Sequence, residues 1–146
     1  MKTQEVKGYR IWLNSENMHE STLKWVSELE FAKDEQLFFN DLIKSYTLQL
    51  IESKHFEDGK KMSEEISKVH NEITDLLEEV KRHENGLEIM VDGLDQYEEE
   101  EAYRDEHRKL IIKVNAFLNE YRALKKELFE LVKGVIKEGK QKRLLE

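Results

Sequence analysis

Apolar side chains recur at intervals of three and four residues over three long stretches of the chain, which is the spacing of an amphipathic helix. The clearest stretch covers residues 60–91, where alternating steps of three and four are typical of a coiled-coil-like seam. Gly86 stands inside this pattern and is expected to weaken the helix by about 1 kcal/mol without ending it. The apolar positions are Met62, Ile66, Val69, Ile73, Leu76, Val80, Leu87 and Met90, widened by Leu77 and Val91.

Two further stretches predict long helices over residues 17–53 and 96–139. Ser15 and Asn17 are candidate N-caps for the first of them. Its apolar stripe consists of Leu23, Phe31, Ala32, Phe38, Phe39, Leu42, Ile43, Tyr46 and Leu50. The stripe of the last helix consists of Tyr103, Leu110, Val114, Phe117, Tyr121, Leu124, Leu128, Leu131 and Val135.

Short turns join these helices. The segment 54–59, which ends in the turn signal Asp58-Gly59, separates the first two helices, and the segment 92–95 separates the last two. Asp95 followed by Glu98 resembles a capping box. Long helices joined by short turns pack side by side and alternate in direction. The sequence therefore predicts an all-α fold: an antiparallel up-down-up three-helix bundle over residues 16–146, preceded by a short N-terminal arm over residues 1–15. Trp12 in this arm suggests that the arm docks onto the bundle or onto a second subunit.

Composition agrees with long helices and narrows the classes of function. The 146 residues include no proline and six glycines, and charged and hydrophobic residues each make up 38%. A net charge of −8 argues against nucleic-acid binding, and the absence of cysteine excludes disulfides, thiolate catalysis and cysteine-based zinc sites. We find no apolar run near the roughly 20 residues of a membrane span and no signal-peptide core, so we expect no membrane insertion and a cytoplasmic location.

Two carboxylates stand out in the first predicted helix. At about 100° per residue, Glu28 and Glu35 fall within roughly 40° of the middle of its apolar stripe. Carboxylates are almost never fully buried unless they are paired or bound to a cation. Some other group is therefore expected to compensate them.

Matching heights along the predicted bundle supplies candidates for that group. If the chain reverses direction at residues 57 and 94, residues 82–83 and 106–107 lie at the same height along the bundle as the midpoint of Glu28 and Glu35. His83, Glu84 and His107 stand at or next to those positions. Three carboxylates and two imidazoles are thus expected at one level.

Three interpretations of this polar layer remain open. Glu–His hydrogen bonds would satisfy the layer and fix the register of the bundle. Alternatively, the five side chains would bind a divalent metal such as iron, manganese or zinc. The Glu-x-x-His pattern of di-iron bundles is missing, because Val80 and Arg104 stand three residues before the two histidines. Acid–base catalysis by carboxylates of raised pKa is the third interpretation; neither a nucleophile motif nor a phosphate-binding loop supports an enzyme.

Three short segments carry a resemblance. They are Trp25-Val26-Ser27-Glu28-Leu29-Glu30-Phe31-Ala32-Lys33-Asp34-Glu35, His83-Glu84 and Asp105-Glu106-His107. With them the chain resembles an uncharacterised group of small helical bacterial proteins. The resemblance implies a helical bundle and a cytoplasmic location, and it implies no particular activity, cofactor or partner.

The sequence thus favours a non-catalytic interaction or assembly module, acting as a homodimer or with another protein partner. The alternative is a divalent-metal-binding bundle with Glu28, Glu35, His83, Glu84 and His107 as ligands. Neither hypothesis requires a cofactor other than that metal.

Overall fold

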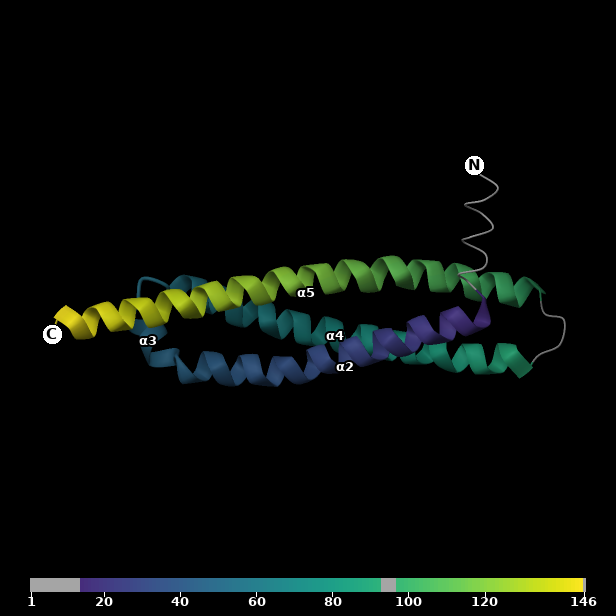
Figure 1. Cartoon of the computed structure of the whole chain (residues 1–146), viewed down its shortest axis with the longest axis horizontal. Helices are drawn as coiled ribbons and strands as arrows, with labels where there is room; N and C mark the ends of the chain where they lie inside the picture. Colours follow the sequence, from purple (N-terminus) through teal and green to yellow (C-terminus); the bar gives the residue numbers. More distant parts are fainter. Residues whose placement is uncertain (1–13, 93–96, 146) are drawn as a thin grey trace, which may run out of the picture. The chain divides into compact units, whose positions relative to one another are not determined.

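The computed structural model describes residues 14–92 and 97–145, and side chains over 14–87 and 98–145. These residues form the helices α2 (Ser15–Ser45), α3 (Thr47–Glu52), α4 (Phe56–Asp92) and α5 (Tyr97–Leu145), shown in Figure 1, and they contain no strand. The all-α prediction is confirmed. Most of the predicted N-terminal arm, with Trp12, lies outside the described residues, as does the second predicted turn beyond Asp92.

Helix α2 begins with a side-chain cap that the sequence did not single out. The backbone N–H of Asn17 donates to Oδ1 of Asn14 over 2.8 Å. This is the three-residue reach by which an N-cap side chain satisfies a free N–H of the first turn. Asn14, rather than Ser15 or Asn17, is therefore the cap.

The single helix predicted over residues 17–53 is divided at Tyr46. The Tyr46 backbone has φ −107° and ψ 13°, and its N–H bonds to the carbonyl of Ile43 at 3.1 Å. On either side, the hydroxyls of Ser45 and Thr47 donate to the carbonyls of Asp41 and Ile43. Hydroxyls that bond backbone carbonyls one turn earlier bend or end helices.

The connection predicted over residues 54–59 is shorter and lies earlier in the chain, because Asp58 and Gly59 belong to the first turns of α4. The connection consists of residues 53–55, in which the N–H of His55 donates to Oγ of Ser53 over 3.0 Å. Gly59 serves close packing instead: a Cβ there would lie 2.9 Å from Cδ2 of the buried Leu50. Helix α5 likewise continues past its predicted end at Gly139.

The chain divides into two compact units, and α2, α4 and α5 each contribute to both. Unit 1 contains Met1–Phe31 and Asp75–Ala116, and unit 2 contains Ala32–Thr74 and Phe117–Glu146. Each unit is described separately below. The single domain expected over residues 16–146 stays a prediction.

In unit 1, α4 and α5 run antiparallel. His83 of α4 lies against His107 of α5, while Lys113, further along α5, pairs with Glu79, earlier on α4. Three helical segments supply the buried apolar side chains. These are Met18, Trp25, Leu29, Leu76, Leu77, Val80, Leu87, Tyr103, Leu110 and Val114.

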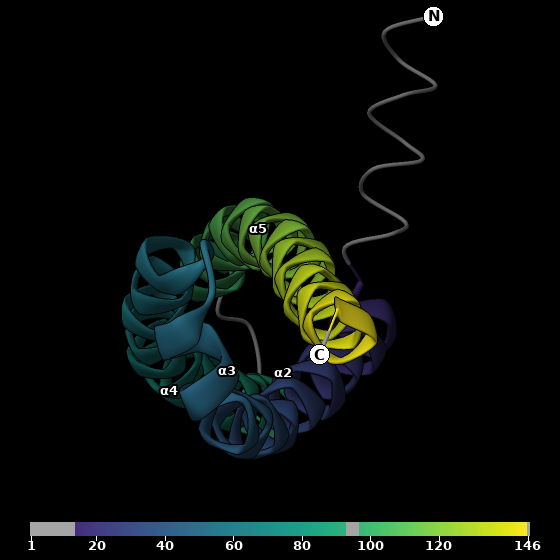
Figure 2. The ribbon, with the colours of Figure 1, turned by 90° about the vertical axis from the view of Figure 1, so that its left-hand side faces the viewer.

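In unit 2, α2 and α5 run parallel, since Glu35 bonds Lys125 and Phe39, four residues later, contacts Phe129. Figure 2 shows α3 between the end of α2 and the start of α4. The buried apolar side chains here are Ala32, Phe39, Leu50, Met62, Ile66, Ile73, Phe117, Tyr121, Leu124, Leu128 and Val135. Over the described side chains, the apolar seams predicted for α4 and α5 thus lie in the cores, although Val69 and Leu131 are only half-buried. Met90 and Val91 lie outside the described side chains.

The stripe predicted for the first helix is correct only in part, since Ala32, Phe39 and Leu50 are buried and Leu42, Ile43 and Tyr46 are half-buried. The inner face of α2 is rotated away from the middle of that stripe. Its buried side chains follow steps of four and three and include two polar residues: Met18, Thr22, Trp25, Leu29, Ala32, Gln36 and Phe39. Leu23, Phe31 and Phe38, which were expected in the stripe, are 50%, 64% and 58% exposed. Helix α2 is therefore apolar on two faces, and the polar residues in its inner seam made the outer face look like the buried one.

None of the described helices has a stretch long and apolar enough to cross a membrane.

Candidate functional site

Two histidines from different helices meet in the core of unit 1. Nε2 of His83 on α4 lies 2.9 Å from Nδ1 of His107 on α5. The residues are only 2% and 1% exposed. Matching heights along the sequence correctly predicted that these two side chains would come together.

Aromatic rings enclose the pair. The ring of Tyr103 stacks on His83 at 4.1 Å between centroids and 6° between planes, and its hydroxyl donates to the His83 carbonyl over 2.9 Å. Trp25 of α2 stacks on His107 at 4.8 Å and 27°. All three helical segments of unit 1 therefore contribute to one layer of four stacked rings.

Glu106 favours one arrangement of protons on the pair. Its Oε1 lies 3.3 Å from Nδ1 of His83, although Nδ1 has no partner with hydrogen-bond geometry among the described residues. A carboxylate attracts an N–H group, so the proton of neutral His83 is favoured on Nδ1. With that tautomer, Nε2 of His83 accepts a hydrogen bond from Nδ1–H of His107.

Burial keeps both imidazoles neutral. It lowers the pKa of His107 to about 4, with a further contribution from His83. Burial also lowers the pKa of His83, against the opposing effect of Glu106. Burial, with Glu84 and Glu106 nearby, raises the pKa of the Tyr103 hydroxyl well above its usual range. The layer is thus a neutral hydrogen-bonded stack at pH 7.

The predicted carboxylates of unit 1 do not join the pair. Oε1 of Glu84 lies 2.5 Å from Nδ1 of His19. Glu28, whose side chain is 39% exposed, is 3.8 Å from Lys24 one turn earlier. Glu28 lies at the surface because the seam of α2 runs beside it rather than on it. The side chain of Glu84 is 15% exposed, and its Oε2 is buried without a hydrogen-bond partner among the described residues.

Glu35 belongs to unit 2 and has its own partners. Its Oε1 accepts a hydrogen bond from the Tyr121 hydroxyl at 2.9 Å and from Nζ of Lys125 at 3.3 Å. The Tyr121 hydroxyl also lies 3.3 Å from the Ala32 carbonyl. Burial, followed by the bond to Glu35, raises the pKa of Tyr121 above its usual range.

The five predicted metal ligands therefore do not form one set. Among the described side chains, no group of three or more His, Asp or Glu is arranged to hold a metal ion. His83 and His107 also direct the ring nitrogens that face each other into their mutual hydrogen bond. The arrangement does not fit a metal centre as it stands.

Two partners in the layer were missed by the sequence reasoning, Glu106 and His19. The height match had reached residues 106–107, so the same counting pointed at Glu106 as well as His107. No comparable signal existed for His19, since its contact with Glu84 depends on how α2 and α4 face each other.

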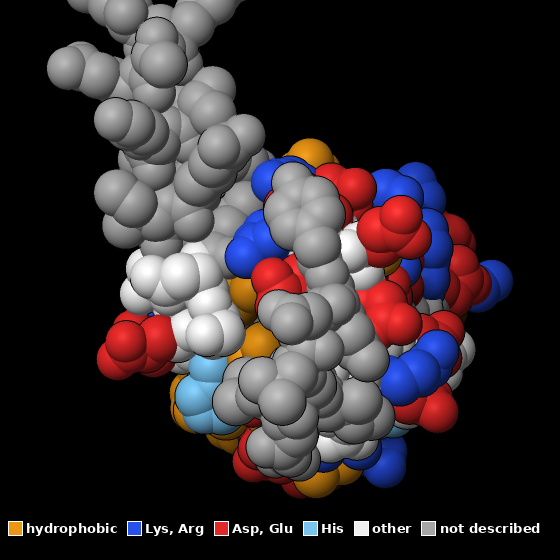
Figure 3. Space-filling view, turned by 90° about the vertical axis from the view of Figure 1, so that its right-hand side faces the viewer, with side chains coloured by type: hydrophobic (Ala, Val, Ile, Leu, Met, Phe, Trp, Pro, Cys, Tyr) orange, Lys and Arg blue, Asp and Glu red, His pale blue; other side chains and the backbone are white. Residues whose placement is uncertain are grey.

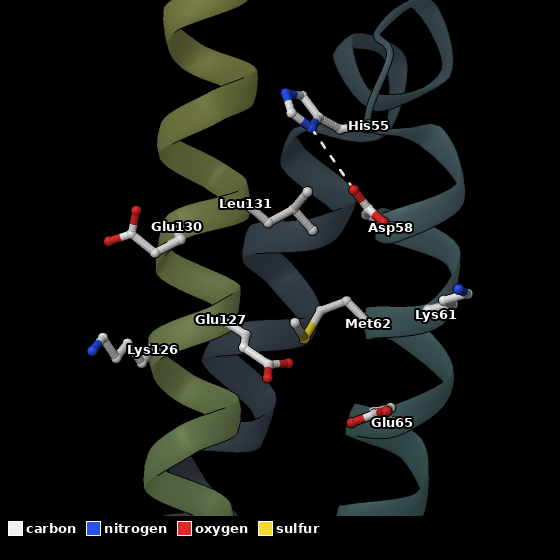
Figure 4. A pocket seen from close by; sticks show the side chains of 9 residues that line it. All are labelled: His55, Asp58, Lys61, Met62, Glu65, Lys126, Glu127, Glu130 and Leu131. Carbon is white, nitrogen blue, oxygen red and sulfur yellow. Dashed lines mark ion pairs between the residues drawn. The ribbon is translucent and has the colours of Figure 1, made fainter.

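Unit 2 contains an open cleft of about 530 Å³ between α4 and α5. In Figure 4, Met62 and Leu131 point toward each other across it, while Lys126 and Glu130 point away from α4. At one end, His55 lies 4.0 Å from Asp58 and 3.8 Å from Glu138. Both acidic and basic side chains line the cleft, so its charge points to no particular class of ligand.

One end of unit 1 carries described side chains of both charge signs. Figure 3 faces the N-terminal ends of α2 and α5, and there Lys and Arg side chains alternate with Asp and Glu. Comparisons with models of protein families, with curated proteins and with solved structures found no match to this chain. The candidate site is therefore interpreted from its own geometry.

Proposed function

We propose that this protein is a non-catalytic interaction or assembly module, located in the cytoplasm. In this proposal the chain forms an antiparallel up-down-up three-helix bundle. The buried histidine layer fixes how the helices of unit 1 meet, and an outward apolar face binds a partner.

The observation that carries the proposal is a group of exposed apolar side chains on α2 and α3 within unit 2. A helix that is apolar on two faces is usually covered on both. Exposed apolar side chains that gather on one part of a soluble protein typically mark interaction sites. These side chains are Leu37 at 62%, Phe38 at 58%, Leu48 at 73% and Ile51 at 56%.

The histidine layer supports a structural rather than a catalytic role. The ring nitrogens between His83 and His107 are bonded to each other, and stacked rings cover both imidazoles. A general base needs a free nitrogen within reach of a substrate. Buried polar pairs of this kind specify which helix faces meet, as they do in some coiled coils.

The test compares complex formation by the full chain and by face variants. Light scattering coupled to gel filtration would measure the mass of wild type, Leu37→Ser and Leu48→Ser. We expect the wild type to form a defined complex, by itself or with a purified partner, which both variants weaken at least ten-fold. Ile112→Ser is the matched control, because Ile112 is 71% exposed on α5, outside the proposed face.

A strictly monomeric wild type that binds no partner would contradict the proposal. Equal loss of binding in Ile112→Ser would also contradict it, since any exposed apolar side chain would then have the same effect.

A further inference from the structure

In unit 2, two exposed phenyl rings lie on either side of one buried phenyl ring. Phe38 and Phe129 are 58% and 46% exposed, whereas Phe39 is 2% exposed. The centroid of Phe39 lies 5.9 Å from that of Phe38 and 6.1 Å from that of Phe129. Helices α2 and α5 thus present apolar side chains on a common surface, which we call the phenylalanine surface.

Charged side chains of opposite sign border this surface on its two sides. At about 100° per residue, Asp34 and Asp41 lie within roughly 60° of Phe38 around α2, on the side away from Glu35. Lys126 and Lys133 lie within roughly 60° of Phe129 around α5, on the side away from Lys125. The α2 border is therefore acidic and the α5 border is basic.

The charges at the borders are available for a partner. All four side chains are exposed. Among the described residues, no ion pair joins Asp34, Asp41 or Lys126 to another side chain, and Lys133 has only a 3.6 Å contact with Glu130 on its own helix. Between the borders, Glu35 and Lys125 already neutralise each other at 3.3 Å.

The two borders also match in height. The contacts of Glu35 with Lys125 and of Phe39 with Phe129 fix how far α5 is offset from α2 in this unit. With that offset, Lys126 and Lys133 each stand two residues beyond the level of Asp34 and Asp41, about 3 Å along the axis. Each Asp therefore lies within one helix turn of the level of the corresponding Lys.

From this pattern we infer that the phenylalanine surface binds a second copy of this chain, with α2 packed against the partner's α5. The inference rests on the proposed function and names its partner. In a dimer whose two-fold axis runs parallel to the helices, α2 of one copy faces α5 of the other. Equivalent residues of the two copies then lie at the same level along the axis. This arrangement therefore brings Asp34 and Asp41 to the partner's Lys126 and Lys133, with the phenyl rings between them.

The other face-to-face arrangement is disfavoured by charge. A two-fold axis across the helices would place acidic border on acidic border and basic on basic, which costs free energy. A self-complementary patch is what a two-fold dimer requires. One surface that holds both signs at matched heights fits a second copy better than a partner of uniform charge.

Charge reversal on one border at a time tests the inference. Wild type, Asp34→Lys/Asp41→Lys, Lys126→Glu/Lys133→Glu and the variant with all four changes would be compared by sedimentation and light scattering. We expect a wild-type dimer, at least ten-fold weaker dimerisation in each double variant, and recovery in the variant with all four changes. An equimolar mixture of the two double variants should form a heterodimer.

Controls separate a lost contact from lost folding or altered net charge. Glu64→Lys/Glu65→Lys changes the net charge by as much as Asp34→Lys/Asp41→Lys does, at exposed positions of α4. Its dimerisation should equal that of wild type. Helical circular dichroism should be unchanged in all variants. Phe38→Ser/Phe129→Ser should weaken the dimer without changing its charge dependence.

The outcomes also separate this inference from the proposed function. A monomeric wild type that still binds another partner through the outer face of α2 would overturn the inference and leave the proposed function. A wild-type dimer that tolerates both double reversals and the loss of both phenyl rings would overturn the inference as well. Failure of the mixed double variants to associate would contradict the pairing of α2 with the partner's α5.

Discussion

His83 and His107 face each other across α4 and α5 with 2.9 Å between their ring nitrogens, and both residues are almost completely buried. Since burial lowers the pKa of each imidazole, the bond is one between neutral rings. Glu106 Oε1, at 3.3 Å from Nδ1 of His83, favours a proton on that nitrogen. Unit 1 therefore has a polar contact with a defined direction inside its core.

Replacing both histidines should cost less stability than the sum of the two single replacements. We expect His83→Leu and His107→Leu each to lower the free energy of unfolding by about 1–3 kcal/mol, because the remaining ring is left buried with an unsatisfied nitrogen. The double variant should lose less than the sum, which a double-mutant cycle by urea unfolding would measure. Strict additivity would show that the two rings do not depend on each other.

Acid should destabilise the protein through the same pair. The folded pKa of His107 is about 4, below the unfolded value of 6.5. The unfolded state therefore binds more protons below pH 6.5, and stability falls as the pH drops from about 6.5 toward 4. The contribution of His107 amounts to about 3 kcal/mol at pH 4.

Thermal unfolding between pH 8 and pH 4 measures this effect. His107→Leu should show a smaller loss of stability with acid than wild type over the same range. An identical pH profile in the two proteins would show that His107 does not titrate as proposed.

A metal test distinguishes the structural layer from the metal hypothesis. We expect untagged protein purified without chelator to carry no stoichiometric iron, manganese or zinc, since His83 and His107 bind each other. Elemental analysis would check this. Near-stoichiometric metal that is lost in both His83→Ala and His107→Ala would establish the metal centre instead.

Gly86→Ala should stabilise the protein by about 0.5–1 kcal/mol through helix propensity. A Cβ at this position would lie 3.5 Å from Cε2 of Tyr103, an ordinary contact. Gly139→Ala is the control, because a Cβ there meets nothing within 4 Å. Chemical unfolding that shows Gly86→Ala to be less stable than wild type would mean that Tyr103 cannot accommodate the methyl group.

The seams of α4 and α5 were predictable because their buried positions are almost all apolar. Helix α2 was not, since Thr22 and Gln36 occupy its seam while Phe31 and Phe38 face outward. A hydrophobicity pattern cannot tell an inner face that contains polar residues from an outer face that contains aromatic ones. The error of placing Glu28 and Glu35 at the centre of the stripe followed directly.

As with the fold, only part of the candidate site could be predicted from the sequence. Counting residues along helices brought His83 and His107 to one level because only their height was needed. The partners of Glu84 and Glu28 depend on the rotation of each helix about its own axis, which packing decides. The sequence holds this information only through the packing of many side chains together.

The two-faced character of α2 also affects synthesis on the ribosome. The Ala32 carbonyl finds its partner, the Tyr121 hydroxyl, 89 residues later in the chain. At about 5–20 residues per second, this delay lasts roughly 4 to 18 s. During that time the inner seam of α2 lacks its α5 partner, so α2 displays apolar side chains on both faces and becomes a natural target for a chaperone.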